Sequence, residues 1–317
     1  MCEKNIEKAI NILAIMMCVK NGACFIDLQL ASIKNQIFKK FDLYISFNKS
    51  NDNSLRKIEE FRLANPQINI VILKGKDRHF ANNFIDLAKS ISQNYKFYAF
   101  CDQDDIWEDF HLERAVNEIN ENSQKNKPYL CCSATKLIDK EDKSLGHSII
   151  FRRSPSFENA LVQSIAGGNT MIFNKKACAL LEEIDTNIYK IPSHDWMMYL
   201  IVTAFEGKVS YHSSSSVKYR QHKDNLIGSN RGAIAFLKRL KLAYKGEWTE
   251  WVNINTLILK NFKDLPKSSS QKLKEFDHAR LSKSINKRMR LYTSVGIYRQ
   301  TFLGNINLFL AVIAKKI

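Results

Sequence analysis

The first 130 residues alternate between short apolar runs and longer amphipathic segments. We predict strands at residues 12–18, 43–47, 68–73 and 97–101, and helices at 25–36, 55–63, 84–91 and 106–119. Strands that alternate with helices at this spacing form βαβ units, so we expect a mostly parallel sheet. In such sheets ligands bind beyond the carboxyl ends of the strands. The segments that follow Cys18, Phe47 and Cys101 are therefore where we expect a site.

Three carboxylates follow the last of these strands within four residues, at Asp102, Asp104 and Asp105. Carboxylates this close repel one another unless a cation joins them. Hard divalent ions prefer oxygen ligands, and Mg²⁺ in particular usually shares them with substrate phosphates. One aspartate could instead cap a helix that begins at Ile106, but capping accounts for one carboxylate and not for three. The cluster therefore favours a divalent metal site.

Positive charge is concentrated in the last part of the chain, where residues 231–317 read as helices almost throughout. This part holds 18 Lys and Arg against 5 Asp and Glu, whereas residues 1–230 hold 30 against 27. A basic tail suits nucleic acid, anionic lipid or a phosphorylated substrate, or is simply a solvated helical face. Within it, the apolar run Phe302–Ala314 is too short to span a bilayer. It fits equally a helix at a membrane surface or a helix that packs on the domain.

Six motifs occur in order between residues 11 and 230. They are Asn21-Gly22 with Phe25, Gln29-Leu30, Ser32-Ile33 and Gln36; Asn82-Asn83-Phe84; Asp102-Gln103-Asp104-Asp105-Ile106-Trp107; Gly168-Asn169-Thr170-Met171; His194-Asp195-Trp196; and Tyr219-Arg220-Gln221-His222, with Asn225 and Gly228 following. Together they resemble the motifs of family 2 glycosyltransferases, notably the bacterial group that builds lipopolysaccharide and capsule chains.

The resemblance implies an α/β fold of the GT-A type, in which a mostly parallel central sheet binds a nucleotide-sugar. It implies a GT-A-like catalytic domain over residues 1–230, followed by the basic, mostly helical region 231–317. It also implies that the enzyme uses a divalent metal, Mn²⁺ or Mg²⁺. The sugar would move with inversion at its anomeric carbon.

The resemblance assigns a role to each site residue. Asp195 would be the general base that takes the proton of the acceptor. The metal ligands would be Asp104, Asp102 and His222. The donor and its diphosphate would contact Asn21, Asn48, Asn83, Asp102, Gln103 and Arg220. The acceptor side would be formed by Asp105, Trp107, Gly168, Asn169, His194 and Trp196.

Several of these residues also have a structural reading. Asp195 stands at an expected helix start, where an aspartate is a common N-cap. Trp107 and Trp196 are as well explained as core anchors as they are as platforms for a sugar ring. A histidine such as His194 is, by itself, more often a loop or capping residue than a catalyst.

One motif departs from the family pattern. The family's D-D-G-S nucleotide motif after the second strand reads Phe47-Asn48-Lys49-Ser50 here. In the family that acidic pair reaches the base and the ribose, so its loss bears on donor recognition. Asn48 can still hydrogen-bond, since a carboxamide keeps one acceptor and gains donors. The alternative is a glycosyltransferase-like protein that binds or scaffolds without catalysing transfer.

The expected partners follow from the resemblance and the charge. We expect a UDP- or dTDP-linked sugar donor and a lipid-linked saccharide acceptor. No nucleic-acid motif is recognised, so an anionic membrane surface is the better partner for residues 231–317. The seven cysteines lack metal-ligand spacing and mostly lie in apolar runs, as in a cytosolic protein. We therefore expect a cytoplasmic enzyme, peripheral at the inner face of the cell membrane.

Overall fold

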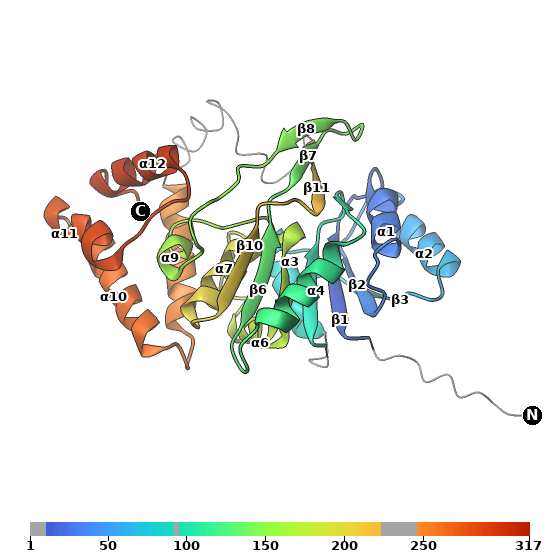
Figure 1. Ribbon diagram of the computed structural model, residues 1–317, viewed down its shortest axis with the longest axis horizontal. Helices are drawn as coiled ribbons and strands as arrows, with labels where there is room; N and C mark the ends of the chain where they lie inside the picture. Colours follow the sequence, from blue (N-terminus) through green and yellow to red (C-terminus); the bar gives the residue numbers. More distant parts are fainter. Residues whose placement is uncertain (1–10, 92–94, 223–245) are drawn as a thin grey trace, which may run out of the picture.

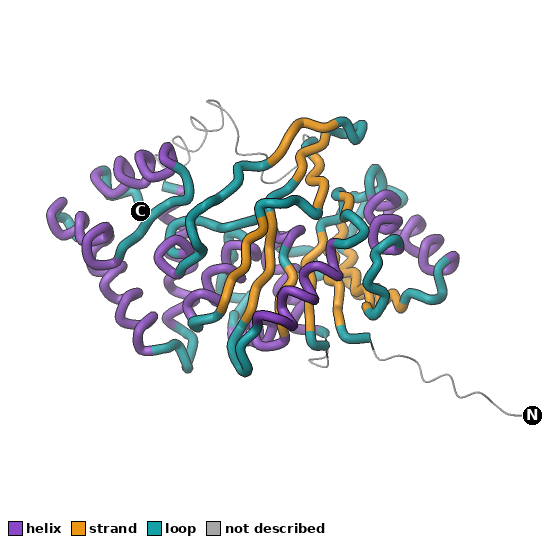
Figure 2. Tube along the Cα trace, viewed as in Figure 1, coloured by secondary structure: helices purple, strands orange, loops and turns teal. Residues whose placement is uncertain are grey.

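A computed structural model describes residues 11–91, 95–222 and 246–317. A seven-stranded, mostly parallel sheet lies at the centre of this part of the chain (Figures 1 and 2). Its strand order is β10-β6-β9-β4-β1-β2-β3, and only β9 runs antiparallel to its neighbours. The strands are β1 (Leu13–Val19), β2 (Phe41–Phe47), β3 (Asn69–Lys74), β4 (Phe97–Cys101), β6 (Tyr129–Ser133), β9 (Ile172–Asn174) and β10 (Lys208–His212).

Helices cover both faces of this sheet. One face carries α1 (Ile26–Lys34), α2 (Ser54–Ala64) and α4 (His111–Asn122); the other carries α3 (Phe80–Ser90), α5 (Phe157–Ala160), α6 (Lys175–Leu180) and α7 (His194–Ala204). Successive side chains of a strand point to opposite faces, so β1 serves both. Ile15 packs with the helices of the first face, and its neighbour Met16 packs with those of the second. This two-sided burial explains why the strand sequences are apolar throughout rather than alternating.

The C-terminal helices extend the second face. They are α9 (Glu247–Lys260), α10 (Lys267–Leu281), α11 (Ile285–Arg290) and α12 (Phe302–Ile313), with a π-helical turn, η3 (Leu291–Val295), before α12. Trp248, Phe276 and Leu308 belong to the same hydrophobic cluster as α3 and α7. The predicted helical tail therefore packs on the sheet domain through a continuous core. The expected boundary at residue 230, with Asn225 and Gly228, lies outside the described residues.

A small second sheet stands beyond the carboxyl end of β4. Its order is β5-β11-β7-β8, formed by β5 (Ile106–Trp107), β11 (Val217–Arg220), β7 (Lys136–Ile138) and β8 (Ser144–His147). In Figure 1 it lies at the upper edge of the molecule, towards which the parallel strands of the large sheet run. Because β11 pairs with β5, the residues after β11 lie beside the acidic cluster. This pairing brings together parts of the site that are far apart in sequence.

The four predicted strands of the first 101 residues are confirmed to within two residues at each end. Two helix predictions are wrong at their start. The helix expected at 84–91 already begins at Phe80. Ile106 and Trp107 form β5, and the helix expected at 106–119 begins only at His111. Trp107 is buried and pairs with Val217, so tertiary contact overrides the helical spacing of the segment. Among the described residues, no helix combines the length and apolarity that a membrane span needs.

Candidate active site

The site residues lie where the parallel strands end. Asp102 and Asp104 follow β4, and the loops after β1, β2 and β3 border the same edge. We call two parts of this edge by name. The metal side comprises Asp102, Asp104, Asp105, Arg220 and His222. The donor corner comprises Lys20, Asn48 and Asp77, at the ends of β1, β2 and β3.

His222 reaches the acidic cluster from the end of β11. Its Nε2 lies 2.7 Å from Oδ2 of Asp104, and both side chains keep some exposure to solvent. The His222 ring also packs against Phe25, with 5.2 Å between ring centroids. A carboxylate oxygen and an imidazole nitrogen thus converge at one point on the surface of the site.

This pair fits a divalent ion that is completed by substrate. The described residues hold no group of three or more His, Cys, Asp and Glu side chains arranged as a full metal cage. Mg²⁺, however, is usually held by one or two carboxylates together with substrate phosphates. Burial, followed by the charges of Asp104 and Asp195, raises the pKa of Asp102 to about 8. A nearby cation would relieve this repulsion, which is the chemistry expected of a metal-binding carboxylate.

Arg220 is fully buried and bonded to the protein. Its Nε donates to the carbonyl oxygen of Asp104 at 2.9 Å, and its Nη1 donates to that of Asp139 at 3.0 Å. It also pairs with the Asp142 carboxylate, and its guanidinium lies 4.5 Å from the centre of the Phe25 ring. These contacts place Arg220 beneath the acidic cluster, where it holds the backbone of a metal-side residue.

Asp105 is likewise buried and shared between two other elements. Its Oδ1 accepts a hydrogen bond from the Arg220 backbone N–H at 3.0 Å, and its Oδ2 accepts one from the Asn169 side chain at 2.5 Å. Burial, then Asp104 and Asp102, raises the pKa of Asp105 well above its usual value. Asn169 belongs to the short 3₁₀ helix η1 (Gly168–Thr170). Asp105 therefore ties β4 to both β11 and η1.

Asp195 lies in the first turn of α7. Its Oδ1 accepts hydrogen bonds from the Trp196 backbone N–H at 2.5 Å and from the Ser193 hydroxyl, and the Gly168 backbone also bonds to the carboxylate. Burial nevertheless raises the pKa of Asp195 to about 7. A carboxylate with a pKa near neutrality is a suitable general base, because it is ionised and still basic enough to take a proton.

His194 is enclosed by aromatic rings. It stacks on Phe84 with 4.1 Å between centroids, and Phe100 meets it edge-on at 4.8 Å. Burial, and secondarily His79, lowers the pKa of His194 to about 3, so the ring is neutral at physiological pH. A Cβ added to Gly168 would lie 2.1 Å from His194 Nε2, so this close approach requires glycine. The His194 ring thus fixes where the Gly168 turn stands beside Asp195.

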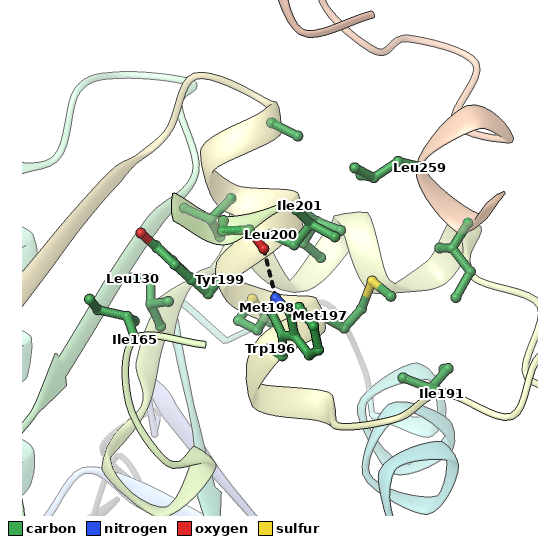
Figure 3. Packing of buried hydrophobic residues seen from close by; sticks show 14 of the residues in the cluster. Leu130, Ile165, Ile191, Trp196, Met197, Met198, Tyr199, Leu200, Ile201 and Leu259 are labelled. Atoms are coloured by element: carbon green, nitrogen blue, oxygen red, sulfur yellow. Dashed lines mark hydrogen bonds between the residues drawn. The ribbon is translucent and has the colours of Figure 1, made fainter. Parts of the chain in front are cut away.

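Both tryptophans of the predicted acceptor side are buried. The Trp107 indole N–H donates to the Asn169 carbonyl at 3.2 Å, and that of Trp196 donates to the Ala160 carbonyl at 2.6 Å. Figure 3 shows Trp196 among core residues that include Met197 and Leu200. The indole rings of Trp107 and Trp196 therefore support the walls of the site from inside the protein.

The donor corner is held by fewer and more exposed contacts. Asn48 Oδ1 accepts a hydrogen bond from the Asp77 backbone N–H at 3.1 Å, and Asp77 pairs with Lys20 at 2.9 Å. Lys20 and Asp77 are each about half exposed, with 56% and 48% of their side-chain surface accessible. The Asn48 amide also carries an NH₂ group, which can donate hydrogen bonds to a ligand.

Three other predicted donor residues shape the loops. Gln103 bonds both to the Lys20 backbone N–H, at 2.9 Å, and to its carbonyl, at 3.0 Å. Asn21 adopts a positive φ of 50° and accepts a hydrogen bond from the Asn51 backbone N–H at 2.9 Å. Asn83 is buried and accepts a bond from the Ser46 hydroxyl at 2.9 Å. Together they fix the strand-end loops against one another.

Sequence reasoning missed several residues that build the site. Ser193 bonds to Asp195, and Asp142 pairs with Arg220. Asn82 was noticed only as part of a motif, yet its side chain donates to the Thr186 and Tyr189 carbonyls and accepts from the Ile191 backbone N–H. These partners are distant in sequence or lie in loops, so no periodic pattern marks them.

Comparison with solved structures defines the class of protein. TarS of S. aureus, residues 1–349 in complex with UDP, superposes with a TM-score of 0.54 at 15% identity, covering 88% of this chain and 74% of that 1–349 chain. The mannosyltransferase PcManGT of Pyrobaculum calidifontis, in complex with GDP-Man and Mn²⁺, superposes with a TM-score of 0.54 at 12% identity. That match covers 98% of this chain and 86% of PcManGT. The fold is that of the GT-A glycosyltransferases, as the motifs predicted.

Sequence comparison gives the family. The model of glycosyl transferase family 2 matches residues 14–178, more than half of the 317 residues, and the chain belongs to this family. A curated relative, the dTDP-rhamnosyl transferase RfbG of Shigella flexneri, is 29% identical over 252 residues. The match covers 75% of this chain and 83% of RfbG. The prediction of a glycosyltransferase is therefore confirmed.

Proposed function

We propose that the protein is an inverting, metal-dependent glycosyltransferase. It would elongate a bacterial surface polysaccharide, either that of lipopolysaccharide or that of the capsule. The observation that carries the proposal is the convergence of His222 on Asp104, on the same sheet edge where burial raises the pKa of Asp195 to about 7. One side of the site thus suits a metal-bound diphosphate, and the other suits an acceptor hydroxyl that must lose a proton.

The leaving group is handled on the metal side. Asp104 and His222, with Asp102 beside them, would hold Mn²⁺ or Mg²⁺. When bound, the metal neutralises the charge that builds up on the departing diphosphate. Arg220 keeps Asp104 in place by binding its backbone carbonyl. We therefore assign Arg220 to positioning, in place of the direct diphosphate contact that the resemblance implies.

The acceptor is activated by Asp195. Its carboxylate accepts the hydroxyl proton as the new bond to the anomeric carbon forms, on the face opposite the leaving diphosphate. General-base help of this kind contributes about 10²–10⁴ in rate. Ser193 and the Gly168 and Trp196 backbone groups orient the carboxylate. Asp105, Trp107, Asn169, His194 and Trp196 would then act by holding Gly168 and α7 in place.

The donor is proposed to be dTDP- or UDP-linked. RfbG is a dTDP-rhamnosyl transferase, and the TarS structure was determined with UDP. Uracil and thymine present the same N3–H and carbonyl edge, to which the Asn48 NH₂ can donate. Asp77, adjacent to Asn48, offers a carboxylate where the D-D-G-S acidic pair is missing. Asn21, Asn83 and Gln103 would contribute by fixing the loops of the donor corner.

The acceptor is proposed to be a lipid-linked saccharide at the cytoplasmic face of the cell membrane. Residues 231–317, with 18 Lys and Arg against 5 Asp and Glu, would hold the enzyme at an anionic inner leaflet. Each basic residue near such a surface contributes roughly 1 kcal/mol. The lipid-linked acceptor would then be presented in the plane where the enzyme is bound.

Thermal unfolding with nucleotides tests the proposal. The protein would be heated with UDP, dTDP, GDP or CDP, each with and without Mn²⁺, beside an Asp104→Ala variant. A ligand at about 100 times its dissociation constant stabilises a fold by roughly 2.7 kcal/mol, which is visible as a higher midpoint. We expect dTDP or UDP to raise the midpoint only with metal, and Asp104→Ala to abolish the shift.

A second candidate function is a binding or scaffold protein without transferase activity. It is favoured by one observation, the presence of Phe47 and Asn48 in place of the family's acidic pair. If no nucleotide shifts the unfolding midpoint in the presence of Mn²⁺, the donor site is inactive and this alternative replaces the transferase.

A further inference from the structure

The outer face of α12 is apolar along its whole length. Gly304, Leu308, Ala311 and Val312 face the protein and are buried. The opposite face exposes six large apolar side chains: Phe302, Leu303, Ile306, Phe309, Leu310 and Ile313. At 3.6 residues per turn these six fall within an arc of roughly 120°, and no polar residue interrupts it. We call this set the apolar face of α12.

The exposure is large for a water-facing surface. Phe302 has 81% of its surface accessible and Leu303 has 56%. Single exposed apolar residues are ordinary, but a contiguous set on one helix indicates a docking surface. The sequence left open whether this helix packs or lies on a membrane. The structure shows that one face packs on the domain and that the other is available.

The surroundings of this face carry one sign of charge. Residues 278–317 contain eight Lys and Arg and no Asp or Glu. Two of the eight, Arg280 and Arg288, are buried in protein contacts. Of the others, Lys283, Lys287 and Arg290 are exposed on and before α11, and Lys315 is exposed just after α12.

Arg288 fixes the basic helix against the apolar one. Its Nε donates to the Val312 carbonyl and its Nη2 donates to the Ile313 carbonyl, each at 2.7 Å. Its Nη1 donates to the Ser282 and Lys283 carbonyls at 3.0 and 2.8 Å. The guanidinium thereby joins the end of α12 to the segment that begins α11. The basic segment around α11 and the end of α12 are therefore held next to each other.

We infer that the apolar face of α12 inserts into the headgroup region of an anionic lipid bilayer, with the basic residues of α11 and Lys315 resting on the lipid phosphates. An apolar stripe beside a basic rim is the pattern of helices that lie in the membrane plane. Pairing with a second copy of the chain would bring two basic rims together without an acidic residue from residues 278–317 to neutralise them. Lipid phosphates supply the opposite charge, and acyl chains cover the apolar side chains.

The position of α12 suits the proposed function, on which this part of the inference rests. In Figure 1 α12 lies at the upper left, on the same edge of the molecule as β7 and β8 of the small sheet. The parallel strands of the large sheet end towards this edge. A bilayer bound by α12 would then lie near the edge of the molecule at which the candidate site is placed, as a lipid-linked acceptor requires.

Vesicle co-sedimentation of the full-length protein tests the inference. We expect binding to vesicles of phosphatidylcholine with about 30% phosphatidylglycerol, and little binding to phosphatidylcholine alone, because surface attraction requires anionic lipid. Phe302→Gln with Ile306→Gln should weaken binding about tenfold or more, since two apolar side chains no longer enter the bilayer. The matched control Ile37→Gln with Leu63→Gln changes two exposed apolar residues on the α1–α2 side and should leave binding unchanged.

A charge series separates insertion from simple electrostatic attraction. Lys283→Gln, Lys287→Gln and Arg290→Gln together should weaken binding strongly and reduce its salt dependence. The control triple Lys34→Gln, Lys39→Gln and Lys40→Gln alters exposed lysines near α1 and should have a smaller effect. If the Phe302/Ile306 variant binds anionic vesicles as tightly as the native protein, insertion is wrong.

Two further results would also overturn the inference. One is an absence of vesicle binding by the native protein. The other is dimerisation of the native protein that the Phe302/Ile306 variant abolishes in sedimentation equilibrium, which would assign the face to a second copy. The Phe302/Ile306 variant and the Lys283/Lys287/Arg290 variant should both keep any nucleotide-induced rise in unfolding midpoint. Failure of the membrane inference is thus distinguishable from failure of the proposed transferase function.

Discussion

The metal side and the donor corner border the same sheet edge but are built differently. On the metal side, Arg220 and Asp105 are fully buried and bonded to three separate elements. In the donor corner, an ion pair between half-exposed Lys20 and Asp77 stands over Asn48. A buried polar network fixes geometry, because every broken bond leaves an unsatisfied group. Exposed contacts are weak and can rearrange around a ligand. The metal side is thus rigidly held, whereas the proposed nucleotide contacts in the donor corner are made by more adaptable side chains.

The largest effect is expected from Asp195→Asn. Removing the general base should lower the transfer rate by about 10²–10⁴. The measurement is release of the nucleoside diphosphate from the proposed dTDP- or UDP-linked sugar donor, with cell membranes supplying the acceptor. Asp264→Asn, a change of an exposed carboxylate remote from the site, serves as the control and should be active. A variant at Asp195 that retains more than a tenth of native activity would remove this residue from the reaction.

The next largest effect is expected on the stability of the fold, which should depend more on the metal side than on the donor corner. Arg220→Met removes the hydrogen-bond donor to the Asp104 and Asp139 carbonyls and the partner of the Asp142 carboxylate. It should lower the free energy of unfolding, measured in urea, by about 3–5 kcal/mol. Arg220→Lys should recover only part, since an ammonium cannot reproduce the planar fork. The control is Arg56→Met, which removes an exposed helical ion pair and should leave the stability nearly unchanged. Native stability with lost nucleotide affinity would instead place Arg220 on the diphosphate.

The pH profile tests the environment of Asp195. Its pKa is raised, so the carboxyl is mostly protonated below pH 7 and cannot accept a proton. The transfer rate should therefore climb about tenfold per pH unit up to a midpoint near 7, then level off. The residual rate of Asp195→Asn should lack this midpoint. A native midpoint near 4, the ordinary value for a carboxyl, would show that burial does not govern this group.

The raised pKa of Asp195 also affects how the stability of the fold depends on pH. Because the folded state holds the Asp195 proton more tightly than the unfolded chain does, this group favours folding at acidic pH and loses that contribution as pH rises from about 4 to 7. Asp195→Asn has no charge to bury. It should accordingly be no less stable than the native protein at pH 8, in contrast to Arg220→Met.

The smallest effect is expected in the donor corner. Asn48→Asp replaces an NH₂ donor with a carboxylate oxygen but keeps the acceptor used by the Asp77 N–H. One hydrogen bond of this kind is worth about 1 kcal/mol, so the affinity for dTDP or UDP relative to that for CDP should change by roughly tenfold or less. Nucleotide-dependent unfolding midpoints measure this ratio. A complete loss of binding would show that Asn48 is as rigidly required as the metal side.

The sequence predicted what is local and repetitive. Strands such as β4 are apolar runs ended by a polar cluster, and burial on both faces makes that pattern strong. The junction of the metal side was not predicted from periodicity. His222 meets Asp104 across 118 residues of chain because β11 pairs with β5. The same pairing turned an expected helix start into β5, since the cross-strand partner of Trp107 cannot be read from neighbouring residues.

The spacing of residues in the sequence also could not predict which site residues are buried. Family motifs identified Arg220, His194 and Trp196 as site residues, but each is enclosed by protein atoms. A motif is retained equally well by a residue that touches substrate and by one that supports the residue that does. Only contacts such as that of Arg220 with the Asp104 carbonyl separate the two.

Asn82 helps to fix the distance between the donor corner and Asp195. Its side chain ties α3 to the loop before α7 through Thr186, Tyr189 and Ile191, while the next residue, Asn83, bonds to Ser46 near the end of β2. One helix therefore sets how far the donor corner stands from Asp195, the proposed general base. Productive geometry tolerates only about 0.5 Å of error. The side chains that are proposed to contact the nucleotide can therefore change during evolution while this distance stays the same. Donor preference could then change without a change in the positions of the proposed catalytic residues.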